Sequence, residues 1–487
     1  MEKIRNILFF IILFIGILIP KNLILHDYDN PSASHILDAT IKDDLLIVSG
    51  MIGGIEFYDI SNPEVLNHLD NLTLSGGGGG GQGGGTKPNC VTISGDYAYV
   101  TTNRGLGVIN ISNPNNPQYL GIVSGTDNYI LENLDVYENF LAVAAHEDGV
   151  LFYDISSPAN PEYISTFNAM NAWSVKLENF STHPNYDFVI YIADEDFVYV
   201  ATATVTADGS LDLYPIDHIE LEFSVKDIAY DNNLVYFAKG TGGVDVYQTD
   251  GTHQIEDMTL NCSMHVPCYL DTYDTSVLAN RIETFDNKLA VSDWDDVEVL
   301  EWNGNNLELI GYKNTTRRTM AIATKDNYIY SAEWASVQVF EYGQINGADI
   351  DLNTYELNYP YVENGDSYTL SLEVTNNGNS ILDIVDAYTT NNEFSYSILN
   401  NLSPGETQII DIIYTANSNN SSGSYRIFSN DNDESEVICE TNGNINGANI
   451  GDVAPDFELD IIANGTGSFQ LSDYIGKIIV LAFFAPN

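Results

Sequence analysis

A pair of strand-like segments recurs seven times between residues 36 and 342 of this 487-residue chain. The clearest copies of one segment alternate apolar and polar residues and close on a proline turn: GGIEFYDISNP, GLGVINISNPNNPQYLG and DGVLFYDISSPANPEYIS, which begin at Gly53, Gly105 and Asp148. Weaker copies align at Val200, Tyr247, Leu300 and Phe340, with 40 to 53 residues between successive copies. A strand needs neighbours to bury its faces, so a short unit repeated this often predicts a stack of small sheets.

A second strand precedes every copy of the first, and this second series also numbers seven. Its members start at Asp43, Gly95, Glu138, Asp187, Asn232, Asp286 and Asp326. A period of 40 to 50 residues is typical of propeller blades, and chance would not keep two markers in order through seven rounds. The pattern predicts a mainly all-β protein with a seven-bladed β-propeller over residues 33–343.

The copies resemble the LVIVP repeat family, whose pattern joins a Tyr-x-Tyr-Val strand to a Gly-Leu-x-Val-x-Asp-Ile-Ser-Asn-Pro strand and turn. The first three copies match this pattern, and the later four lose the Ser-Asn-Pro turn. We interpret the glycines and the Asp-Ile-Ser-Asn-Pro segments as turn residues. The alternative is that the repeated Asp59 and Asp154 line a binding rim, although Asn110 replaces the acid in the second copy.

The glycine-rich segment Gly76 to Gly85 lies between the first two copies. It shares only its glycine content with a phosphate-binding loop, because no Lys-Ser/Thr pair follows it. We expect a flexible surface insertion.

Residues 346–442 lose the period but keep strict alternation in about seven strands, the number typical of a small sandwich. They resemble the Ig-like sandwich modules of exported bacterial proteins, notably in the turns Leu402–Glu406 and Ser429–Asp431. The resemblance implies a β-sandwich used for spacing or positioning.

Residues 448–487 resemble the start of a thioredoxin-like redoxin domain of the AhpC/TSA or TlpA/ResA type. The residues that carry the resemblance are Gly451, Ala454, Pro455, Phe457, Leu459, Leu471, Ser472, Asp473, Tyr474, Gly476, Lys477 and Phe484. The family is α/β, and its first central strand leads to a Cys-x-x-Cys motif at a helix N-terminus, where the thiol pKa is lowered.

The resemblance implies that the Cys-x-x-Cys motif would start directly after Asn487, so this chain contains an incomplete, truncated domain and none of the catalytic cysteines. The peroxiredoxin pattern fits less well, because the segment has no threonine upstream of the expected nucleophile. A decayed remnant, or a strand used elsewhere, is the alternative interpretation.

The N-terminal residues 1–24 indicate export. Lys3 and Arg5 precede an apolar run from Ile7 to Ile19, which has the length of a signal-peptide core and is short for a membrane span. No cleavage site follows Pro20, so an uncleaved membrane anchor remains the alternative. We expect a periplasmic, cell-surface or secreted protein.

Four cysteines are present, and the close pair Cys262 and Cys268 is the best candidate for a disulfide in an oxidising compartment. Two free buried thiols, or a zinc site that includes His265, are the alternatives, and zinc would need two more ligands. We expect no metal or other cofactor, apart from a structural calcium ion at Asp431, Asp433 and Glu434.

Composition limits the partners, because 17 basic against 69 acidic residues give a net charge of −52. Such a chain repels phosphate backbones, which excludes nucleic acid. One hypothesis is an exported thiol-disulfide oxidoreductase or antioxidant that, in its complete form, acts on a redox partner protein and uses the propeller as a binding scaffold. The other is a non-catalytic adhesion or binding protein whose propeller takes a protein or glycan ligand. A hydrolase is disfavoured, because His146, His183, His218 and His253 have no nucleophile motif beside them.

Overall fold

The computed structural model describes residues 21–74, 86–179, 185–195, 197–255, 258–275, 277–315, 318–417, 421–432, 434–444, 458–460 and 468–470. Every regular element in these residues is a strand, so the prediction of a mainly all-β protein is confirmed. No helix in these ranges is long and apolar enough to cross a membrane. The chain divides into two compact units, one of residues 1–351 with 377–380 and one of residues 352–376 with 381–487.

The described residues of the first unit form seven four-stranded antiparallel sheets, which we number from sheet 1 to sheet 7. Sheet 1 consists of β2 (Ser34–Lys42), β3 (Leu45–Ile52), β4 (Gly54–Asp59) and β5 (Asn67–Leu72). Sheet 2 consists of β6 (Pro88–Ser94), β7 (Tyr97–Thr102), β8 (Gly105–Asn110) and β9 (Gln118–Ile122). Sheet 3 consists of β10 (Leu134–Tyr137), β11 (Phe140–Ala144), β12 (Val150–Asp154) and β13 (Glu162–Phe167).

The next four sheets follow the same plan, except that the last draws one strand from the other end of the unit. Sheet 4 consists of β14 (Ala172–Asn179), β15 (Phe188–Asp194), β16 (Phe197–Val205) and β17 (Leu211–Glu220). Sheet 5 consists of β18 (Asp227–Asp231), β19 (Leu234–Ala238), β20 (Val244–Ile255) and β21 (Met258–Tyr273). Sheet 6 consists of β22 (Ala279–Phe285), β23 (Lys288–Asp293), β24 (Asp296–Trp302) and β25 (Leu307–Asn314). Sheet 7 consists of β1 (Lys21–Asp29), β26 (Thr319–Lys325), β27 (Tyr328–Glu333) and β28 (Ser336–Gln344).

The two strand series that repeat in the sequence are the second and third strands of each sheet. These strands are nearly continuous apolar runs, and β11 is buried at all five positions. Strands covered on both faces have this composition, because a neighbouring sheet packs on each side. The first and fourth strands are less buried, as β5 shows with no buried position, and they carry a weaker sequence pattern.

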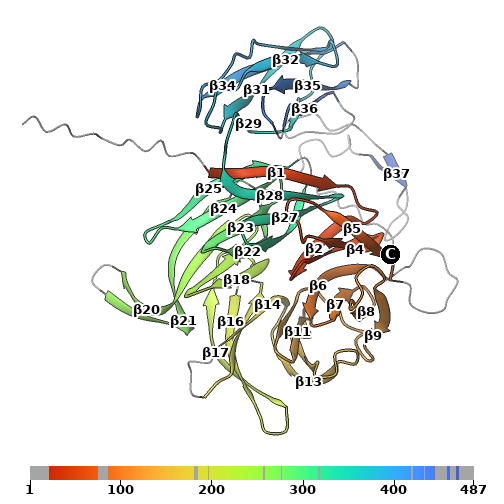
Figure 1. Ribbon diagram of the computed structural model, residues 1–487, viewed down its shortest axis with the longest axis vertical. Coiled ribbons are helices and arrows are strands. Elements are labelled where there is room, and N and C mark those ends of the chain that lie inside the picture. The colour runs from red at the N-terminus through yellow and green to blue at the C-terminus, as the bar shows by residue number, and fades with distance from the viewer. Residues whose placement is uncertain are drawn as a thin grey trace, which may run out of the picture. The chain divides into compact units, whose positions relative to one another are not determined.

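The seven first strands form a closed ring, in which β2, β6, β10, β14, β18, β22 and β26 contact one another in order and β26 contacts β2. An apolar cluster lies between each pair of neighbouring sheets, including one between sheet 7 and sheet 1 that contains Tyr58 and Tyr330. The two ends of the unit meet in sheet 7, where β1 pairs with β28 and Lys21 lies opposite Gln344 (Figure 1). Residues 21–24 of the expected N-terminal segment lie in β1, so strand pairing in this unit extends before the predicted boundary at residue 33.

The second unit is built around two further four-stranded sheets. One has the order β29 (Ile350–Leu352), β31 (Ser367–Asn376), β34 (Thr407–Thr415) and β33 (Phe394–Tyr396). The other has the order β30 (Glu356–Asn358), β36 (Glu436–Gly443), β35 (Ser421–Ser429) and β32 (Ile384–Thr389).

These two sheets pack face to face. The ring of Tyr414 on β34 lies so close to β36 that a Cβ at Gly443 would come within 2.4 Å of it. Tyr359 lies 5.4 Å from Tyr414 between ring centres, and its hydroxyl donates a hydrogen bond to the carbonyl of Ile412 at 2.7 Å. The alternation predicted for this region therefore produces one buried face on each sheet.

One short hairpin is described beyond the second unit's sheets. Strand β37 (Glu458–Asp460) pairs with β38 (Ser468–Gln470), and Leu459 lies opposite Phe469.

Candidate functional site

The interior of the ring is occupied by the side chain of Arg281 on β22. Its Nη2 lies 3.0 Å from the sulfur of Cys90, its Nε lies 3.8 Å from a carboxylate oxygen of Asp38, and its Nη1 donates to the carbonyl of Lys226 at 3.2 Å. Cys90 is on β6, which is not a neighbour of β22 in the ring. The guanidinium therefore crosses the interior and links first strands from non-adjacent sheets.

Acidic residues on alternate first strands tie each of these strands to the next. Asp38 accepts a hydrogen bond from the backbone N–H of Val91 at 2.8 Å, and so joins sheet 1 to sheet 2. Asp135 does the same for sheets 3 and 4, and Asp227 does so for sheets 5 and 6. These carboxylates satisfy buried backbone donors, so their first role is structural.

Burial controls the protonation of the ionisable groups on the first strands, which we call the axial cluster: Asp38, Cys90, Asp135, Lys176, Asp227 and Arg281. It raises the pKa of Asp38 to about 6, although the nearby Arg281 acts in the opposite direction. Burial also raises the pKa of the Cys90 thiol well above its usual value, and the charge of Asp135 raises that of Lys176. Because only a thiolate is a good nucleophile, Cys90 is an inert structural thiol.

A second group of residues lies at one end of the ring, which we call the mouth: His35, His146, Trp173, Trp294, Arg318 and Trp334. His146, Trp294 and Trp334 lie in the turns between the second and third strands of sheets 3, 6 and 7. His35, Trp173 and Arg318 lie at, or next to, the start of a first strand.

Backbone hydrogen bonds hold these turns against the next first strand. The N–H of His35 donates to the carbonyl of Trp334 at 2.7 Å, and the N–H of Thr319 donates to that of Trp294 at 2.8 Å. His146 and Ala172 exchange two such bonds. His146 and Trp294 have φ angles of 47° and 40°, a left-handed conformation that is unfavourable for bulky side chains and persists where surrounding contacts impose it.

The mouth combines aromatic faces with cations. The guanidinium of Arg318 lies 4.8 Å from the ring centre of Trp294 and 5.7 Å from that of Trp334, and the latter lies 4.3 Å from the ring of His35. On sheets 3 to 5, Trp173 contacts the ring of His146 at 4.5 Å and the ammonium group of Lys226 at 5.4 Å. Such pairs keep large side chains ordered while leaving part of their surface accessible to a ligand.

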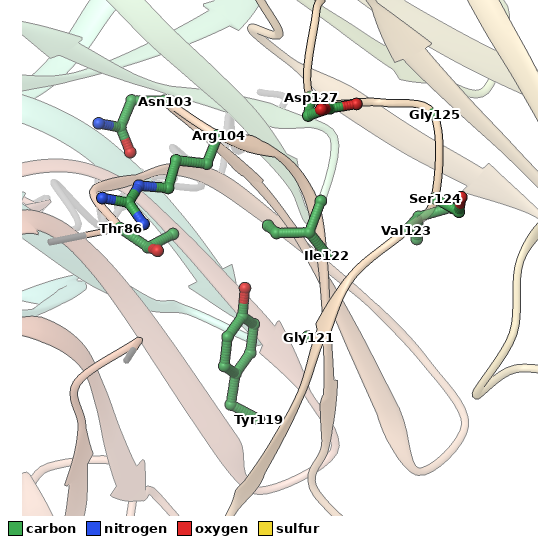
Figure 2. A pocket seen from close by; sticks show the side chains of 10 residues that line it. All are labelled: Thr86, Asn103, Arg104, Tyr119, Gly121, Ile122, Val123, Ser124, Gly125 and Asp127. Carbon is green, nitrogen blue, oxygen red and sulfur yellow. The ribbon is translucent and has the colours of Figure 1, made fainter. Parts of the chain in front are cut away.

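A hollow of about 570 Å³ lies beside the corresponding turn of sheet 2. Its lining includes Arg104 from the turn between β7 and β8, Tyr119, Gly121 and Ile122 from β9, and Asp127. Figure 2 shows the hydroxyl end of Tyr119 pointing toward the space between Arg104 and Ile122. The lining of this hollow combines charged and polar side chains with the apolar side chains of Ile122 and Val123.

The repeated acids Asp59 and Asp154 serve as turn caps. Asp59 accepts the N–H of Ser61 at 2.8 Å, and Asp154 accepts the N–H of Ser156 at 2.7 Å. Asn110 does the same for Ser112 at 3.0 Å, which explains why an amide replaces the acid there. Asp59 and Asp154 also border separate hollows of about 350 and 700 Å³.

The cysteines offer no reactive thiolate among the described residues. Cys262 and Cys268 form a disulfide in β21, so neither sulfur is available as a zinc ligand beside His265. Cys439 is a free thiol on β36, and burial raises its pKa to about 12.

The histidines considered for hydrolysis lie apart from one another in the fold. His146 bonds to Glu132 at 2.8 Å and to Asn171 at 2.9 Å. His218 lies on β17 with its ring 5.3 Å from that of Phe197, and His253 lies on β20 of another sheet.

Two groups of acidic residues are close enough together to be compared as cation sites. In the predicted calcium site, Asp431 is buried and accepts the N–H of Glu434 at 3.4 Å. In sheet 6, Asp293, Asp296 and Glu298 are all buried with ligand atoms within 4.8 Å of one another, and burial and the charge of Glu298 raise the pKa of Asp296 to about 10. Carboxylates this close share a proton at neutral pH, or hold a cation.

Several predicted positions lie outside the described residues. They are the N-terminal residues 1–20, Gly76 to Gly85, His183, Asp433 and the redoxin positions Gly451, Ala454, Pro455, Phe457, Leu471, Ser472, Asp473, Tyr474, Gly476, Lys477 and Phe484.

The sequence predicted neither Arg281 nor the mouth. A signal for part of the mouth does exist, because an acid followed by tryptophan ends the second strand in both sheet 6 and sheet 7, as Asp293-Trp294 and Glu333-Trp334. Aligning the seven copies at this point would have revealed the repeated aromatic. Arg281 has no such signal, since its partners lie in other parts of the chain.

Comparison with known proteins supports the repeat. A family model described as "LVIVD repeat", a β-propeller-type repeat, matches residues 87–124 and 131–169. These segments contain the four strands of sheet 2 and of sheet 3, so one repeat is one sheet. The resemblance given above as LVIVP is therefore to the LVIVD repeat. The chain matches no curated protein.

Solved structures with a similar fold have low sequence identity. The chain is similar to one from a mitotic checkpoint complex, with 11% identity and a TM-score of 0.50 over 70% of this chain and 98% of that chain. It is also similar to a catalytically inactive variant of virginiamycin B lyase from Staphylococcus aureus with quinupristin, with 11% identity and a TM-score of 0.46 over 66% and 99% of the two chains. A computationally designed protein, Ika8, has 13% identity and a TM-score of 0.43 over 66% and 99%.

Proposed function

We propose that the first unit is a seven-bladed β-propeller and the second an Ig-like sandwich. The closed ring of seven first strands, with β1 completing sheet 7, supports the propeller. In the second unit, two four-stranded sheets pair strands one, three, six and five, and strands two, eight, seven and four. This corresponds to the ABED and CFG arrangement of immunoglobulin domains, with β30 added parallel to β36.

We further propose that the protein is exported and acts by binding, with the mouth of the propeller as its recognition surface for a protein or glycan ligand. The observation that carries this proposal is the gathering of three tryptophans and Arg318 at one end of the ring. Tryptophan and arginine dominate binding hot spots, because they bury a large area while keeping a directed polar group. The chain as a whole is acidic, with 69 acidic against 17 basic residues, so a cationic, aromatic group of side chains is an unusual feature in it.

Binding by the full chain to arrays of glycans and of extracellular protein domains tests this proposal. Replacing Trp334 or Arg318 by alanine is expected to weaken binding at least tenfold, because truncating a hot-spot residue costs about 2 kcal/mol or more. Tyr28→Ala is the control, since that tyrosine is 63% exposed and lies on the opposite edge of sheet 7 from β26. Equal binding by the mouth variants and the control, at unchanged melting temperatures, would contradict the proposal.

A second candidate function is thiol-disulfide exchange by a form of the chain that carries a Cys-x-x-Cys motif after Asn487. It is favoured by the redoxin motif from Gly451 to Phe484, and it requires cysteines after Asn487 because the described cysteines are paired or held as buried thiols. We expect a form with that motif to reduce insulin, and a variant of it with both cysteines of the motif replaced by serine to be inactive. Equal rates for the two would exclude this function.

A further inference from the structure

One tyrosine position recurs in the fourth strands of sheets 2, 3 and 5. Its hydroxyl has a hydrogen-bond partner in sheets 3 and 5. Tyr119, Tyr163 and Tyr269 each lie opposite the residue that follows a β-bulge in the third strand, namely Ile109, Tyr153 and Tyr247. They are therefore equivalent positions in three copies of the repeat.

The partner of this hydroxyl is a threonine three residues further along. Tyr163 bonds to Thr166 at 2.8 Å, and Tyr269 bonds to Thr272 at 2.9 Å. In sheet 2 the corresponding residue is Ile122, which has no hydroxyl. The hydroxyl of Tyr119 is buried and has no hydrogen-bond partner within the described part of the chain.

The burial of this hydroxyl has a local cause. The residue across from Ile122 on the third strand is Gly107, where the other two copies have Leu151 and Asp245. A Cβ at Gly107 would lie 3.2 Å from the Tyr119 ring, so the glycine lets that ring lie down against β8. A buried hydroxyl without a hydrogen bond is destabilising, so its place at the edge of a hollow favours a ligand that supplies the missing partner.

The hollow in Figure 2 is lined by several polar side chains in addition to Tyr119. The guanidinium of Arg104 and the carboxylate of Asp127 both line it. Thr86, Asn103 and Ser124 supply further hydrogen-bonding side chains. Gly121 and Gly125 leave it open, because a Cβ at either position would meet nothing within 4 Å.

This combination specifies the chemistry of the ligand. A guanidinium binds a carboxylate in two parallel hydrogen bonds, whereas the carboxylate of Asp127 needs donors such as hydroxyl groups. A ligand with only a carboxylate would leave the side chains of Thr86, Asn103 and Ser124 without hydrogen-bond partners. A phosphate dianion would be repelled by the carboxylate of Asp127. A sugar acid has one carboxylate and several hydroxyls, and its C–H face can lie on Ile122.

We propose that this hollow binds a carboxylated sugar residue, with Arg104 paired to the carboxylate, Tyr119 donating its hydroxyl to a ligand oxygen, and Asp127 accepting from sugar hydroxyls. The site is distinct from the mouth in its residues, so it can be present or absent whatever the mouth binds. Ile122 is the residue that adapts this copy of the repeat for binding, because it replaces the internal partner of the tyrosine.

Titration of the full chain with D-glucuronate at 0.15 M salt, followed by ligand-observed NMR, tests this site. We expect millimolar binding by the wild type and at least tenfold weaker binding of D-glucose and of alanine. Arg104→Gln is expected to weaken glucuronate binding about tenfold or more, which corresponds to 1.4 kcal/mol. Tyr119→Phe removes only the hydroxyl and is expected to weaken binding about fivefold.

Ile122→Thr separates binding from folding. It restores the internal partner found in sheets 3 and 5, so it should weaken glucuronate binding about fivefold while keeping or raising the melting temperature. Tyr163→Phe is the matched control, because it removes the equivalent hydroxyl from a copy whose partner is Thr166, and binding should change less than twofold. No glucuronate binding by the wild type, binding that Ile122→Thr and Tyr119→Phe leave unchanged, or equal binding of glucose or alanine would each overturn the proposal.

Discussion

Replacing Arg281 by methionine is expected to destabilise the first unit strongly, and more at pH 8 than at pH 5. Methionine keeps the apolar stem but removes the charge that faces Asp38 and Asp227 inside the ring. The side chains of Arg281 and Asp38 are only 17% and 14% exposed. Removing one partner of a buried ion pair costs about 3–5 kcal/mol, because the remaining charge stays buried without compensation.

The pH dependence follows from the carboxylate of Asp38. Its pKa in the folded protein is about 6, so at pH 5 it is mostly protonated and loses little when the guanidinium is removed. At pH 8 the variant must either bury an unpaired carboxylate or protonate it, and protonation costs about 1.4 kcal/mol of free energy for each pH unit above the pKa of the group. We therefore expect a loss of about 3 kcal/mol at pH 8, and about half of that at pH 5.

Urea unfolding followed by circular dichroism at both pH values measures these differences. Lys42→Met provides a control, since the ammonium group of Lys42 donates to the carbonyl of Gly95 at the surface, and a loss below about 1 kcal/mol is expected there. A loss for Arg281→Met below about 1 kcal/mol at pH 8, or a greater loss at pH 5, would refute the account of the axial cluster.

Three further outcomes are expected. The wild-type unfolding free energy, measured by urea titration, should fall between pH 5 and pH 8. The pKa of Asp38 in the folded protein is about 6, above its ordinary value of 3.8, so the stability that this group contributes at low pH is lost as the pH rises through 6. A rise in the unfolding free energy over this range would contradict the prediction. Replacing Cys262 and Cys268 by serine should cost about 2 kcal/mol by the same measurement, as expected for closing so short a loop, and no change would argue against the bond. Tyr359→Phe should cost the second unit about 1–2 kcal/mol in calorimetry, because the buried carbonyl of Ile412 loses its donor; an unchanged transition would show that another donor replaces it.

Much of the first unit could be predicted from its strands. The second and third strands of each sheet are buried on both faces, so they appear in the sequence as strong apolar runs with glycine or proline turns. The first and fourth strands are less buried and less regular in sequence, and polar residues interrupt the apolar ones along β21. These strands follow from the sheet as a whole and could not be recognised one at a time.

Predictions about function depended on how far apart the contributing residues are. Asp59 and Asp154 act within two residues of their own positions, and their role as turn caps could be inferred from the repeated Asp-Ile-Ser motif. The mouth combines residues from sheets 1, 3, 4, 6 and 7. The sequence of one repeat does not show which of its residues will contact residues of another copy. Apart from Leu459 in β37, the redoxin residues lie outside the described ranges, and the predictions about them stay predictions.

The sequence by itself determined the all-β class, the period of the repeat and the places where turns must form, because these depend on alternation and on glycine, proline and aspartate acting locally. Only the tertiary structure decided that β1 completes sheet 7, that Arg281 reaches a cysteine 191 residues away, and that the hydroxyl of Tyr119 is left without a partner among the described residues. The physical reason is closure. A ring brings together residues that no local pattern relates, and burial inside it then sets their charge, their hydrogen bonds and their availability to a ligand.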